Sequence, residues 1–184
     1  MADVNWALLG QAVNDWQALG FRYQEVPWLT PVAYSMATAP SRDHLVTSQL
    51  GCHVGSAEQS FIYLDHCGAL PKGKWVSCSP CFRIEPVIDD LHRHHFMKVE
   101  LYQTDEVDQR ALRRLVEQAL NWFQKQLMFR SLSPLAAKVV PTADGFDIEI
   151  NDIEVGSYGF RTFEHLTWIY GTALAEPRFS TAIA

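Results

Sequence analysis

The sequence predicts an α+β domain in which helices flank one mostly antiparallel sheet. The chain has 184 residues, a length typical of a single domain. Two long segments carry apolar residues at helical spacing, and the segments between and after them have the apolar runs and alternation of strands. Neighbouring strand segments are joined by a loop or a tight turn rather than by a helix, which favours antiparallel pairing.

The composition excludes several classes of protein. Hydrophobic residues make up 48% of the chain and charged residues 20%, which excludes disordered and collagen-like sequences. No apolar stretch approaches the roughly 18 residues of a membrane span, and no signal-peptide pattern precedes one. With four cysteines, too few for a disulfide scaffold, we expect a cytoplasmic protein without a membrane partner. The net charge of −6 argues against nucleic-acid binding through bulk charge, with a local basic patch as the alternative.

The first 55 residues predict one helix, one strand and a loop region. Asp3 is placed to cap the helix and Gly20 to end it. Residues 21–29 predict a strand, in which Pro27 favours an edge or interface position. Residues 35–55 are rich in Ser, Thr, Gly and His and predict a loop with short regular pieces. The apolar side of the helix contains Trp6, Leu9, Ala12, Val13, Trp16 and Leu19.

The middle of the chain predicts a short helix, a hairpin and a long helix. Residues 60–67 form the short helix, and residues 75–85 and 96–104 form two strands around a polar loop of about ten residues. Asp105 is placed to cap the long helix. Its apolar stripe contains Leu112, Val116, Ala119, Phe123 and Leu127.

The last third predicts a bridge followed by strands. Residues 131–144 carry two prolines and connect the long helix to the strands. Residues 146–150 and 153–160 alternate apolar and polar side chains, and Asn151-Asp152 between them predicts a tight turn. Residues 166–174 are a further apolar strand.

The hairpin of residues 75–104 carries the most chemical information. Arg83 and Glu85 lie two apart on a predicted strand and share a face, as Phe96 and Glu100 do on the returning strand. Together with the His-rich loop at 92–95, they bring a cation, two carboxylates and an aromatic ring to one surface. Those groups suit an adenine nucleotide, which needs a stacking partner, cations for its phosphates and an acceptor for its amine. The alternative is a hairpin whose charged residues face water.

This hairpin resembles the second signature motif of the class II aminoacyl-tRNA synthetases. That motif is a Phe-Arg-x-Glu strand, a loop with a His four residues before a Phe, and a strand with a Glu. The chain has Phe82-Arg83-Ile84-Glu85, His92, Phe96 and Glu100 in that arrangement. Ahead of it, Ser56-Ala57-Glu58 resembles the Thr-x-Glu loop that holds the substrate amino group in the seryl enzymes. A carboxylate suits that task because an ammonium needs a charge-assisted acceptor.

Two later segments resemble the family's third motif and the strand pair before it. Glu154 and Ser157 have the spacing of the Glu and Ser that hold the magnesium of ATP. Residues three apart on a regular strand face opposite ways, so we expect a bulge or kink at Gly156. The alternative is an edge hairpin with an exposed Glu. Tyr170–Phe179 resembles motif 3, and Arg178 matches its phosphate-binding arginine.

Motif 3 departs from the family at two points, and motif 1 has two alignments. Pro177 stands where the family usually has Glu, and six residues follow Arg178 where the family has a long helix. Gly20–Pro31 resembles motif 1, a helix, a strand and a proline at the dimer interface, with either Pro27 or Pro31 as that proline. The resemblance therefore implies a homodimer through the first helix and residues 21–31, to which we expect three tryptophans to contribute apolar area: Trp6, Trp16 and Trp28.

The resemblance implies a stand-alone class II synthetase-like core over residues 1–184, without an anticodon-binding domain. The reaction implied is ATP-dependent activation of an amino acid, or a similar small carboxylate, through an aminoacyl-adenylate, with Mg²⁺ as cofactor. The catalytic residues are Arg83 and Arg178; ATP is bound by Arg83, Glu85, His92, Phe96 and Arg178; the substrate by Glu58 and Glu100; the metal by Glu154 and Ser157.

The acceptor of the activated group is left open by the sequence. A carrier protein, another protein or a small molecule is expected, with tRNA not excluded. The alternative function is a non-catalytic, synthetase-like regulatory module that binds a nucleotide or an amino acid. Cys78-Ser79-Pro80-Cys81 offers half of a zinc site, but buried free thiols are the commoner reading of such a pair.

Overall fold

A seven-stranded sheet organises the chain in the computed structural model, which describes residues 3–184. The strand order is β1-β5-β6-β10-β9-β8-β7, and β1 and β5 form the one parallel pair among the pairs described. The predicted α+β class with a mostly antiparallel sheet is confirmed. The strands are β1 (Arg22–Tyr23), β5 (Lys74–Phe82), β6 (His95–Gln103), β7 (Ala137–Pro141), β8 (Gly145–Ile150), β9 (Ile153–Phe163) and β10 (Leu166–Glu176).

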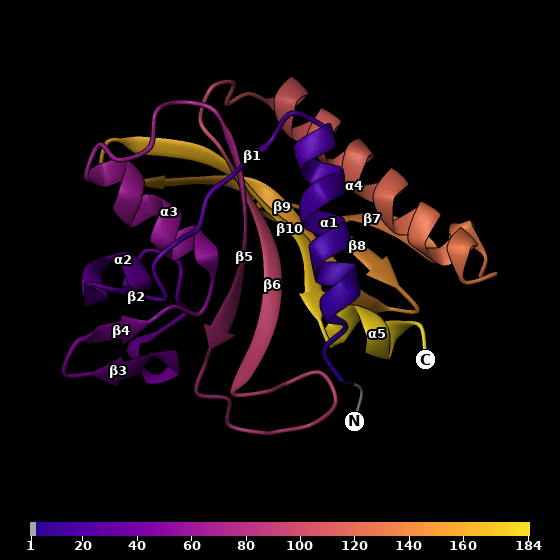
Figure 1. Cartoon of the computed structure of the whole chain (residues 1–184), viewed down its shortest axis with the longest axis horizontal. Helices are drawn as coiled ribbons and strands as arrows, with labels where there is room; N and C mark the ends of the chain where they lie inside the picture. Colours follow the sequence, from indigo (N-terminus) through magenta and orange to yellow (C-terminus); the bar gives the residue numbers. More distant parts are fainter. Residues whose placement is uncertain (1–2) are drawn as a thin grey trace.

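Helices cover both faces of this sheet, as Figure 1 shows. On one face, α1 contacts β5, β6 and β10, while α4 contacts β7, β9 and β10. On the other face, α3 packs against β5, β6 and β10, beside a small sheet in the order β2-β4-β3. The helices are α1 (Trp6–Ala18), α2 (Val32–Met36), α3 (Ala57–His66), α4 (Gln109–Phe129) and α5 (Arg178–Ala182); the small strands are β2 (Leu29–Thr30), β3 (Val46–Ser48) and β4 (Gly51–His53); residues 42–44 and 134–136 form 3-10 turns.

The two long helices, α1 and α4, each bury one apolar side in the core, but both begin later than predicted. All five predicted stripe residues of α4 are buried. Its N-cap is Asp108, whose carboxylate accepts from the Ala111 N–H at 2.7 Å, and not Asp105. Asn5 instead of Asp3 caps α1, accepting from the Leu8 N–H at 3.0 Å. Both predicted caps lie too early because two Asp or Asn residues precede each helix. In each case the second one, directly before the first helical residue, is the cap.

The buried side of α1 differs from the predicted stripe at its ends. Leu9, Ala12 and Trp16 are buried as expected. Trp6 is 66% exposed because it lies about a quarter turn away from these three residues. Leu19 is 42% exposed and follows the last helical residue.

Two predicted strands are shorter in the structure. Residues 21–29 contribute only Arg22–Tyr23 and the first residue of β2, since Pro27 has no N–H to donate to a ladder. The strand predicted over 75–85 ends at Phe82, so Arg83 and Glu85 lie in the following loop. The short helix predicted at 60–67 begins earlier, at Ala57, because Ser56 caps it.

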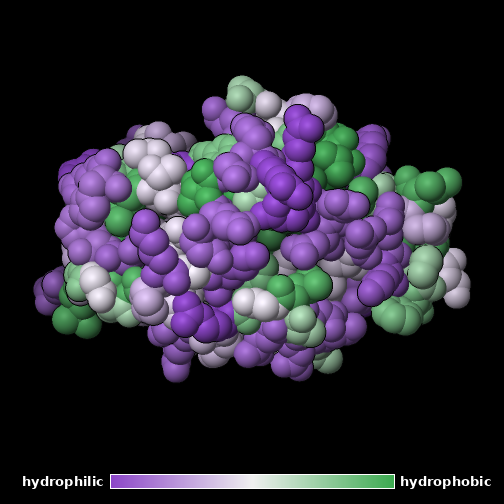
Figure 2. All heavy atoms as spheres, turned by 90° about the horizontal axis from the view of Figure 1, so that it is seen from above, coloured by the Kyte–Doolittle hydropathy of each residue, from purple (hydrophilic) through white to green (hydrophobic). Residues whose placement is uncertain are grey.

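The predicted turn at Asn151-Asp152 is confirmed. Both residues have positive φ, 51° and 61°, which a two-residue turn between β8 and β9 requires. On the face in Figure 2, hydrophobic residues form separate small groups among hydrophilic ones. Within residues 3–184, no helix combines the length and the hydropathy needed to cross a bilayer.

Candidate active site

A pocket of about 400 Å³ lies on the face of the sheet that carries α3. Its floor comes from β6, β9 and β10, and its walls from the start of α3 and the loop after β5. A smaller pocket of about 70 Å³ adjoins it and shares Arg83, Glu85, Glu154 and Arg178. The predicted site residues that line the larger pocket are Glu58, Arg83, Glu85, His92, Glu100, Glu154, Ser157 and Arg178; Phe96 lines the smaller one.

Arg83 is held in place at the open end of the pocket. Its Nε and Nη2 donate to the carbonyl oxygen of Gly55, at 3.4 and 3.2 Å. The guanidinium carbon lies 5.1 Å from the centre of the Phe96 ring, which is within cation–π range. Because two of the five guanidinium N–H groups are accounted for by Gly55, others remain for an anionic ligand.

His92 belongs to the loop between β5 and β6 and pairs with Asp89. Its Nδ1 lies 2.9 Å from one carboxylate oxygen of Asp89. Hydrogen bonds from the His92 side chain and from the Leu91 and His92 backbone lower the pKa of Asp89 to about 2. His94 Nδ1 lies 3.2 Å from the carbonyl oxygen of Arg83, so the end of the loop is held against the backbone at its start.

A β-bulge places Glu154 in the pocket. Opposite β8, Ile148 pairs with Gly156 while Glu149 pairs with Glu154, so Val155 is the extra residue. Val155 is buried in the core on the far side of the sheet, whereas Glu154 and Ser157 both line the pocket. The bulge expected at Gly156 is therefore confirmed, one residue away. Without it, the alternation of the strand would put Val155 in the pocket and Glu154 in the core.

Glu154 and Ser157 provide the kind of oxygens that magnesium prefers. A carboxylate and a hydroxyl on the same pocket wall fit Mg²⁺, which takes few protein ligands and keeps phosphate and water oxygens. Glu154 also pairs with Arg178, with 3.4 Å between Oε1 and Nη1. Arg178 is the first residue of α5, a five-residue helix that supports it in place of a long one.

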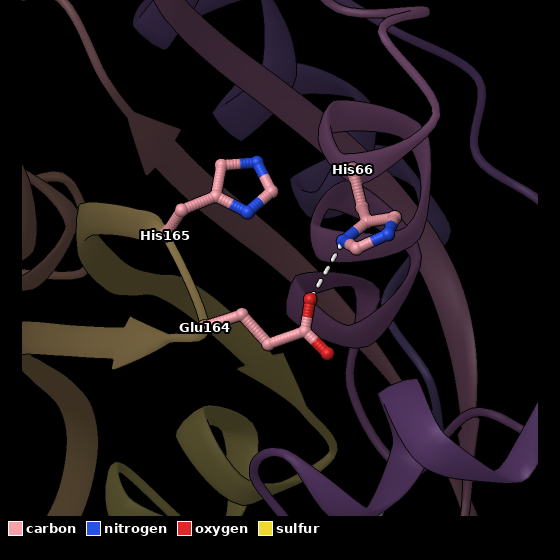
Figure 3. Close-up of side chains that lie close together, drawn as sticks. All are labelled: His66, Glu164 and His165. Atoms are coloured by element: carbon pink, nitrogen blue, oxygen red, sulfur yellow. Dashed lines mark ion pairs between the residues drawn. The ribbon is translucent and has the colours of Figure 1, made fainter.

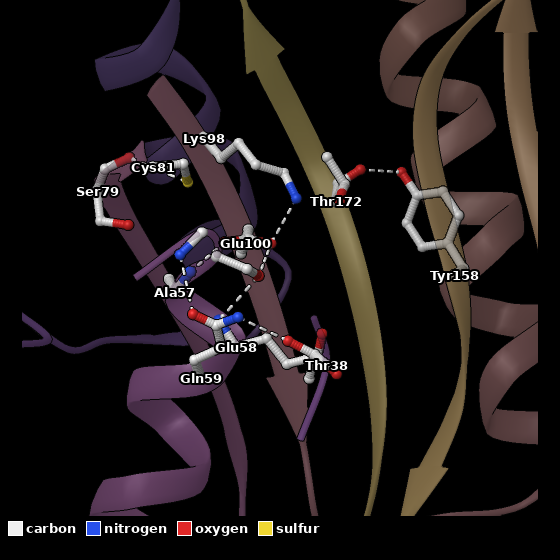
Figure 4. Close-up of polar contacts among 12 residues, drawn as sticks. Thr38, Ala57, Glu58, Gln59, Ser79, Cys81, Lys98, Glu100, Tyr158 and Thr172 are labelled. Atoms are coloured by element: carbon white, nitrogen blue, oxygen red, sulfur yellow. Dashed lines mark hydrogen bonds and ion pairs between the residues drawn. The ribbon is translucent and has the colours of Figure 1, made fainter. Parts of the chain in front are cut away.

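At the other end of the pocket, which we call the closed end, buried charged side chains are already paired with one another. The Lys98 ammonium lies 2.7 Å from Oε1 of Glu100, and both side chains are nearly buried, at 11% and 6% exposed. The Ser56 hydroxyl donates to the same oxygen at 2.6 Å, and the Ala57 N–H donates to Oε2. Figure 4 shows Lys98 and Glu100 on β6, with Glu100 directed at the start of α3. These three donors satisfy a carboxylate that burial would otherwise penalise.

The two buried carboxylates of this closed end have opposite pKa shifts. Burial raises the pKa of Glu100, but the Lys98 ammonium and the donors at Ser56 and Ala57 outweigh it, so the net direction is downward. For Glu58, burial dominates and raises the pKa, although Arg161 and Trp168 act against it.

Glu58 is bonded to the sheet and not free within the pocket. Trp168 Nε1 donates to its Oε1 at 2.7 Å, and Arg161 forms an ion pair with Oε2. The Arg161 guanidinium also lies 4.0 Å from the centre of the Tyr170 ring. A carboxylate predicted to receive a substrate ammonium is therefore already neutralised by an arginine.

Sequence reasoning missed Lys98, Arg161 and Trp168. A signal existed for Lys98, because it lies midway between Phe96 and Glu100 on one strand and period-two alternation gives all three the same face. No local signal marks the other two, since Arg161 and Trp168 are 103 and 110 positions from Glu58.

The cysteine pair shows no sign of a metal site. All four cysteines are free thiols, and Cys81 is buried. Burial raises the pKa of Cys78 to about 11 and that of Cys81 to about 12, which disfavours the thiolate that binds metal. Within residues 3–184, neither belongs to a cluster of three metal-ligating side chains.

Comparison with solved structures identifies the fold, whereas comparisons of sequence do not. No protein-family model matches the chain, and no curated protein matches it either. The seryl-tRNA synthetase of Pyrococcus horikoshii complexed with ATP superposes with a TM-score of 0.71 at 20% identity, covering 96% of this chain and 48% of that one. A pyrrolysyl-tRNA synthetase of Desulfitobacterium hafniense also gives 0.71, at 15% identity and 97% and 66% coverage.

A third structure agrees with these two. The cytoplasmic serine-tRNA ligase of Naegleria fowleri in complex with AMP gives a TM-score of 0.67 at 16% identity, covering 94% of this chain and 46% of that one. The chain spans about half the length of the two seryl enzymes. It therefore has the fold of a class II synthetase catalytic core, as the resemblance of its motifs predicts.

Proposed function

We propose that this chain binds ATP and activates an amino acid, or a similar small carboxylate, as an acyl-adenylate. The observation that carries the proposal is the bulge at Val155, which puts Glu154, Ser157 and Arg178 around one cavity with Arg83. A cavity lined by two arginines and a carboxylate–hydroxyl pair suits a polyphosphate with its magnesium ion. Two of the superposed structures were solved with ATP or AMP.

The proposed reaction is a displacement at phosphorus. A carboxylate oxygen attacks the α-phosphorus of ATP, the bond from that phosphorus to the oxygen bridging to the β-phosphate breaks, and pyrophosphate leaves. Arg83 holds the attacking carboxylate against the α-phosphate and neutralises the charge that develops there. No side chain need act as a nucleophile, because positioning and charge stabilisation are sufficient for this chemistry.

We assign the remaining nucleotide contacts to four further side chains. Phe96 stacks on the adenine, and Arg178 lies on its other face or at the terminal phosphate. Glu85 accepts a hydrogen bond from the nucleotide, and His92 faces the outer phosphates. When bound with the nucleotide, Mg²⁺ would be held by Glu154 and Ser157 and would offset phosphate charge.

At the closed end, we assign Glu58 and Glu100 to binding of the amino acid. Arg161 already neutralises Glu58, so a substrate ammonium would have to share that carboxylate with the arginine. Glu100 is equally committed to Lys98. This saturation favours the second candidate function, a non-catalytic module that binds nucleotide or amino acid and regulates another protein.

Pyrophosphate exchange separates the two functions. The purified chain is incubated with ATP, Mg²⁺ and labelled pyrophosphate, and each of the twenty amino acids is added in turn. Label entering ATP with one amino acid supports activation. Binding of ATP by calorimetry without exchange supports the regulatory module, and absence of both refutes the nucleotide site.

For the acceptor and the compartment, we propose a cytoplasmic core over residues 1–184. It transfers the activated group to a carrier protein, another protein or a small molecule, and tRNA is a further acceptor to test. Incubating the chain with labelled amino acid, ATP and each acceptor class, then measuring acid-stable label, identifies the acceptor.

We also propose a homodimer formed through α1 and residues 21–31. Trp6, Tyr23 and Trp28 are 66%, 45% and 54% exposed, an aromatic surface of the kind that interfaces bury. Trp16, which we expected to contribute to it, is instead completely buried in the core of the same chain. Sedimentation equilibrium at micromolar concentration checks the dimer, and a species of 20.9 kDa would refute it.

A further inference from the structure

Three metal-ligating side chains converge outside the pocket, where the last turn of α3 meets the turn between β9 and β10. They are His66, Glu164 and His165, and their nearest ligand atoms all lie within 4.8 Å of one another. Figure 3 shows the Glu164 carboxylate directed at the His66 ring, with the His165 ring on the same side. None of the three lines either pocket of the candidate active site.

The His66 ring has an unsatisfied nitrogen that points to a missing partner. Its Nδ1 is buried and accepts or donates no hydrogen bond of good geometry within residues 3–184. The same atom lies 3.3 Å from Oε2 of Glu164. Two ligands about 2.0–2.1 Å from a tetrahedral zinc ion are separated by about 3.3 Å. This pair of atoms is therefore already at the spacing that a shared zinc ion requires.

We propose that His66, Glu164 and His165 bind one Zn²⁺, with water in the fourth position. Two imidazoles and one carboxylate are a ligand set that zinc accepts, whereas Mg²⁺ and Ca²⁺ prefer oxygen ligands only. Glu164 and His165 are exposed, so small rotations of their side chains can bring the His165 ring nitrogen to the same ion. Because all three ligands act in their neutral or anionic forms, the site offers one negative charge to the cation.

Two features of the backbone support a cation here. Glu164 has a positive φ of 52° in the two-residue turn, a position where glycine or asparagine is more usual. A glutamate in that conformation has a cost, which a role for its side chain would explain. His66 is the last residue of α3, and the carbonyl end of a helix favours positive charge.

The position of the site suggests what the ion does. Glu58, in the first turn of α3, is bonded to Arg161 on β9 and Trp168 on β10. His66, in the last turn of the same helix, faces the turn that joins those two strands. Zinc therefore fastens the far end of the same helix to the same hairpin, and stabilises the wall that holds Glu58.

Calorimetric titration of the metal-free chain with Zn²⁺ tests the site directly. We expect one zinc ion per chain and a rise in Tm of about 5–10 °C once zinc exceeds its Kd about 100-fold. His165→Ala is the decisive variant, because this exposed turn residue can be replaced without disturbing the core. It should weaken zinc binding at least tenfold, as should His66→Ala, and remove the rise in Tm.

Control variants distinguish this site from other zinc-binding groups. His95→Ala changes an exposed histidine at the start of β6, and Cys67→Ser changes the exposed thiol beside His66. Both should keep wild-type affinity. Co²⁺ in place of zinc should give the intense visible bands of a tetrahedral site, lost in His165→Ala. Absence of binding in the wild type, or binding unchanged in His165→Ala, means that these residues form an ordinary ion pair and overturns the proposal.

Discussion

The two ends of the pocket hold their charged groups in opposite ways. At the open end, Arg178 and Glu154 lie 3.4 Å apart with side chains 30% and 46% exposed. At the closed end, Lys98 and Glu100 lie 2.7 Å apart and are nearly buried. The exposed pair is screened by water and can exchange its partner for a ligand at little cost, whereas separating the buried pair leaves a charge without a partner.

This difference suggests separate roles for the two ends of the pocket. The closed end contributes to the stability of the fold, because its carboxylates are satisfied by donors from α3, β6 and β9. The open end is where we propose that the ligand binds, because its arginines have donors to spare. Substitutions at the open end should therefore change activity and leave folding intact, while those at the closed end should change folding first.

The largest expected effect is on catalysis at the open end. Glu154→Gln removes an anionic metal ligand without changing shape, and we expect pyrophosphate exchange to fall about 10²–10³-fold with unfolding unchanged. Glu149→Gln, on the neighbouring strand and outside the pocket, is the matched control and should keep its exchange rate. Undiminished exchange in Glu154→Gln would refute the magnesium role.

The next effect is on stability at the closed end. Lys98→Met leaves Glu100 buried without its cation, and we expect a loss of about 3 kcal/mol in the free energy of unfolding. The value lies at the lower limit for such pairs because Ser56 and Ala57 still donate to the carboxylate. Urea titration measures it.

An exposed lysine pair provides the control for that experiment. Lys138 and Asp152 lie at the same 2.7 Å separation, but on the surface. Lys138→Met should leave the urea midpoint essentially unchanged. Equal losses in Lys98→Met and Lys138→Met would contradict the difference between buried and exposed pairs on which the comparison rests.

A smaller effect is expected for nucleotide affinity. Arg83→Ala should weaken ATP binding by about 1.5–3 kcal/mol, the worth of a charge-assisted contact to phosphate. Calorimetry with Mg²⁺ present measures it, and Arg113→Ala on the exposed side of α4 is the control. If the wild type binds no ATP, or both variants bind it equally well, Arg83 has no such role.

The smallest effect is on the pH dependence of stability, and it has opposite signs for the two buried carboxylates. Glu100 has a folded-state pKa below its ordinary 4.5, so its contribution is present above pH 4.5 and is lost as the pH falls through the folded value. Glu58 has a folded-state pKa above 4.5, so its contribution to stability is complete below pH 4.5. That contribution is lost as the pH rises through the raised folded-state pKa.

Conservative variants isolate the two carboxylates. Glu100→Gln should flatten the acid side of the stability profile, and Glu58→Gln should flatten the side above pH 4.5. Urea midpoints measured between about pH 3 and pH 8 check both directions. If both variants flatten the same side, the two carboxylates do not differ as described.

The open end could be predicted from the sequence because its signals are local. Arg83 and Phe96 belong to one hairpin, and the spacing of Glu154, Gly156 and Ser157 was sufficient to predict a bulge. The closed end could not be predicted in the same way. Glu58 is more than 100 positions from its partners Arg161 and Trp168, and only the assembled sheet brings Arg161 to the start of α3.

The predicted end of the strand over residues 75–85 was also wrong, again because contacts distant in sequence determine it. The strand predicted to include Arg83 ends at Phe82, whose N–H donates to the carbonyl oxygen of Val54. After it, the Ile84 N–H donates to His44. Val54 directly follows the small sheet, and His44 lies shortly before it. The Arg83 N–H still donates to the carbonyl oxygen of His94, so the chain leaves β6 after Arg83, and nothing within residues 75–85 marks that point.

The extra residue in β9 also limits how chains of this fold can change length as they diverge. Inserting one residue between Ile148 and Glu149 of β8 would restore regular pairing with β9, but it would turn Glu154 toward α4 and into an apolar interior. Deleting a residue from the loop after Phe82 reverses no strand. Insertions and deletions should therefore accumulate in that loop, while β8 and β9 keep the lengths that place Glu154 in the pocket.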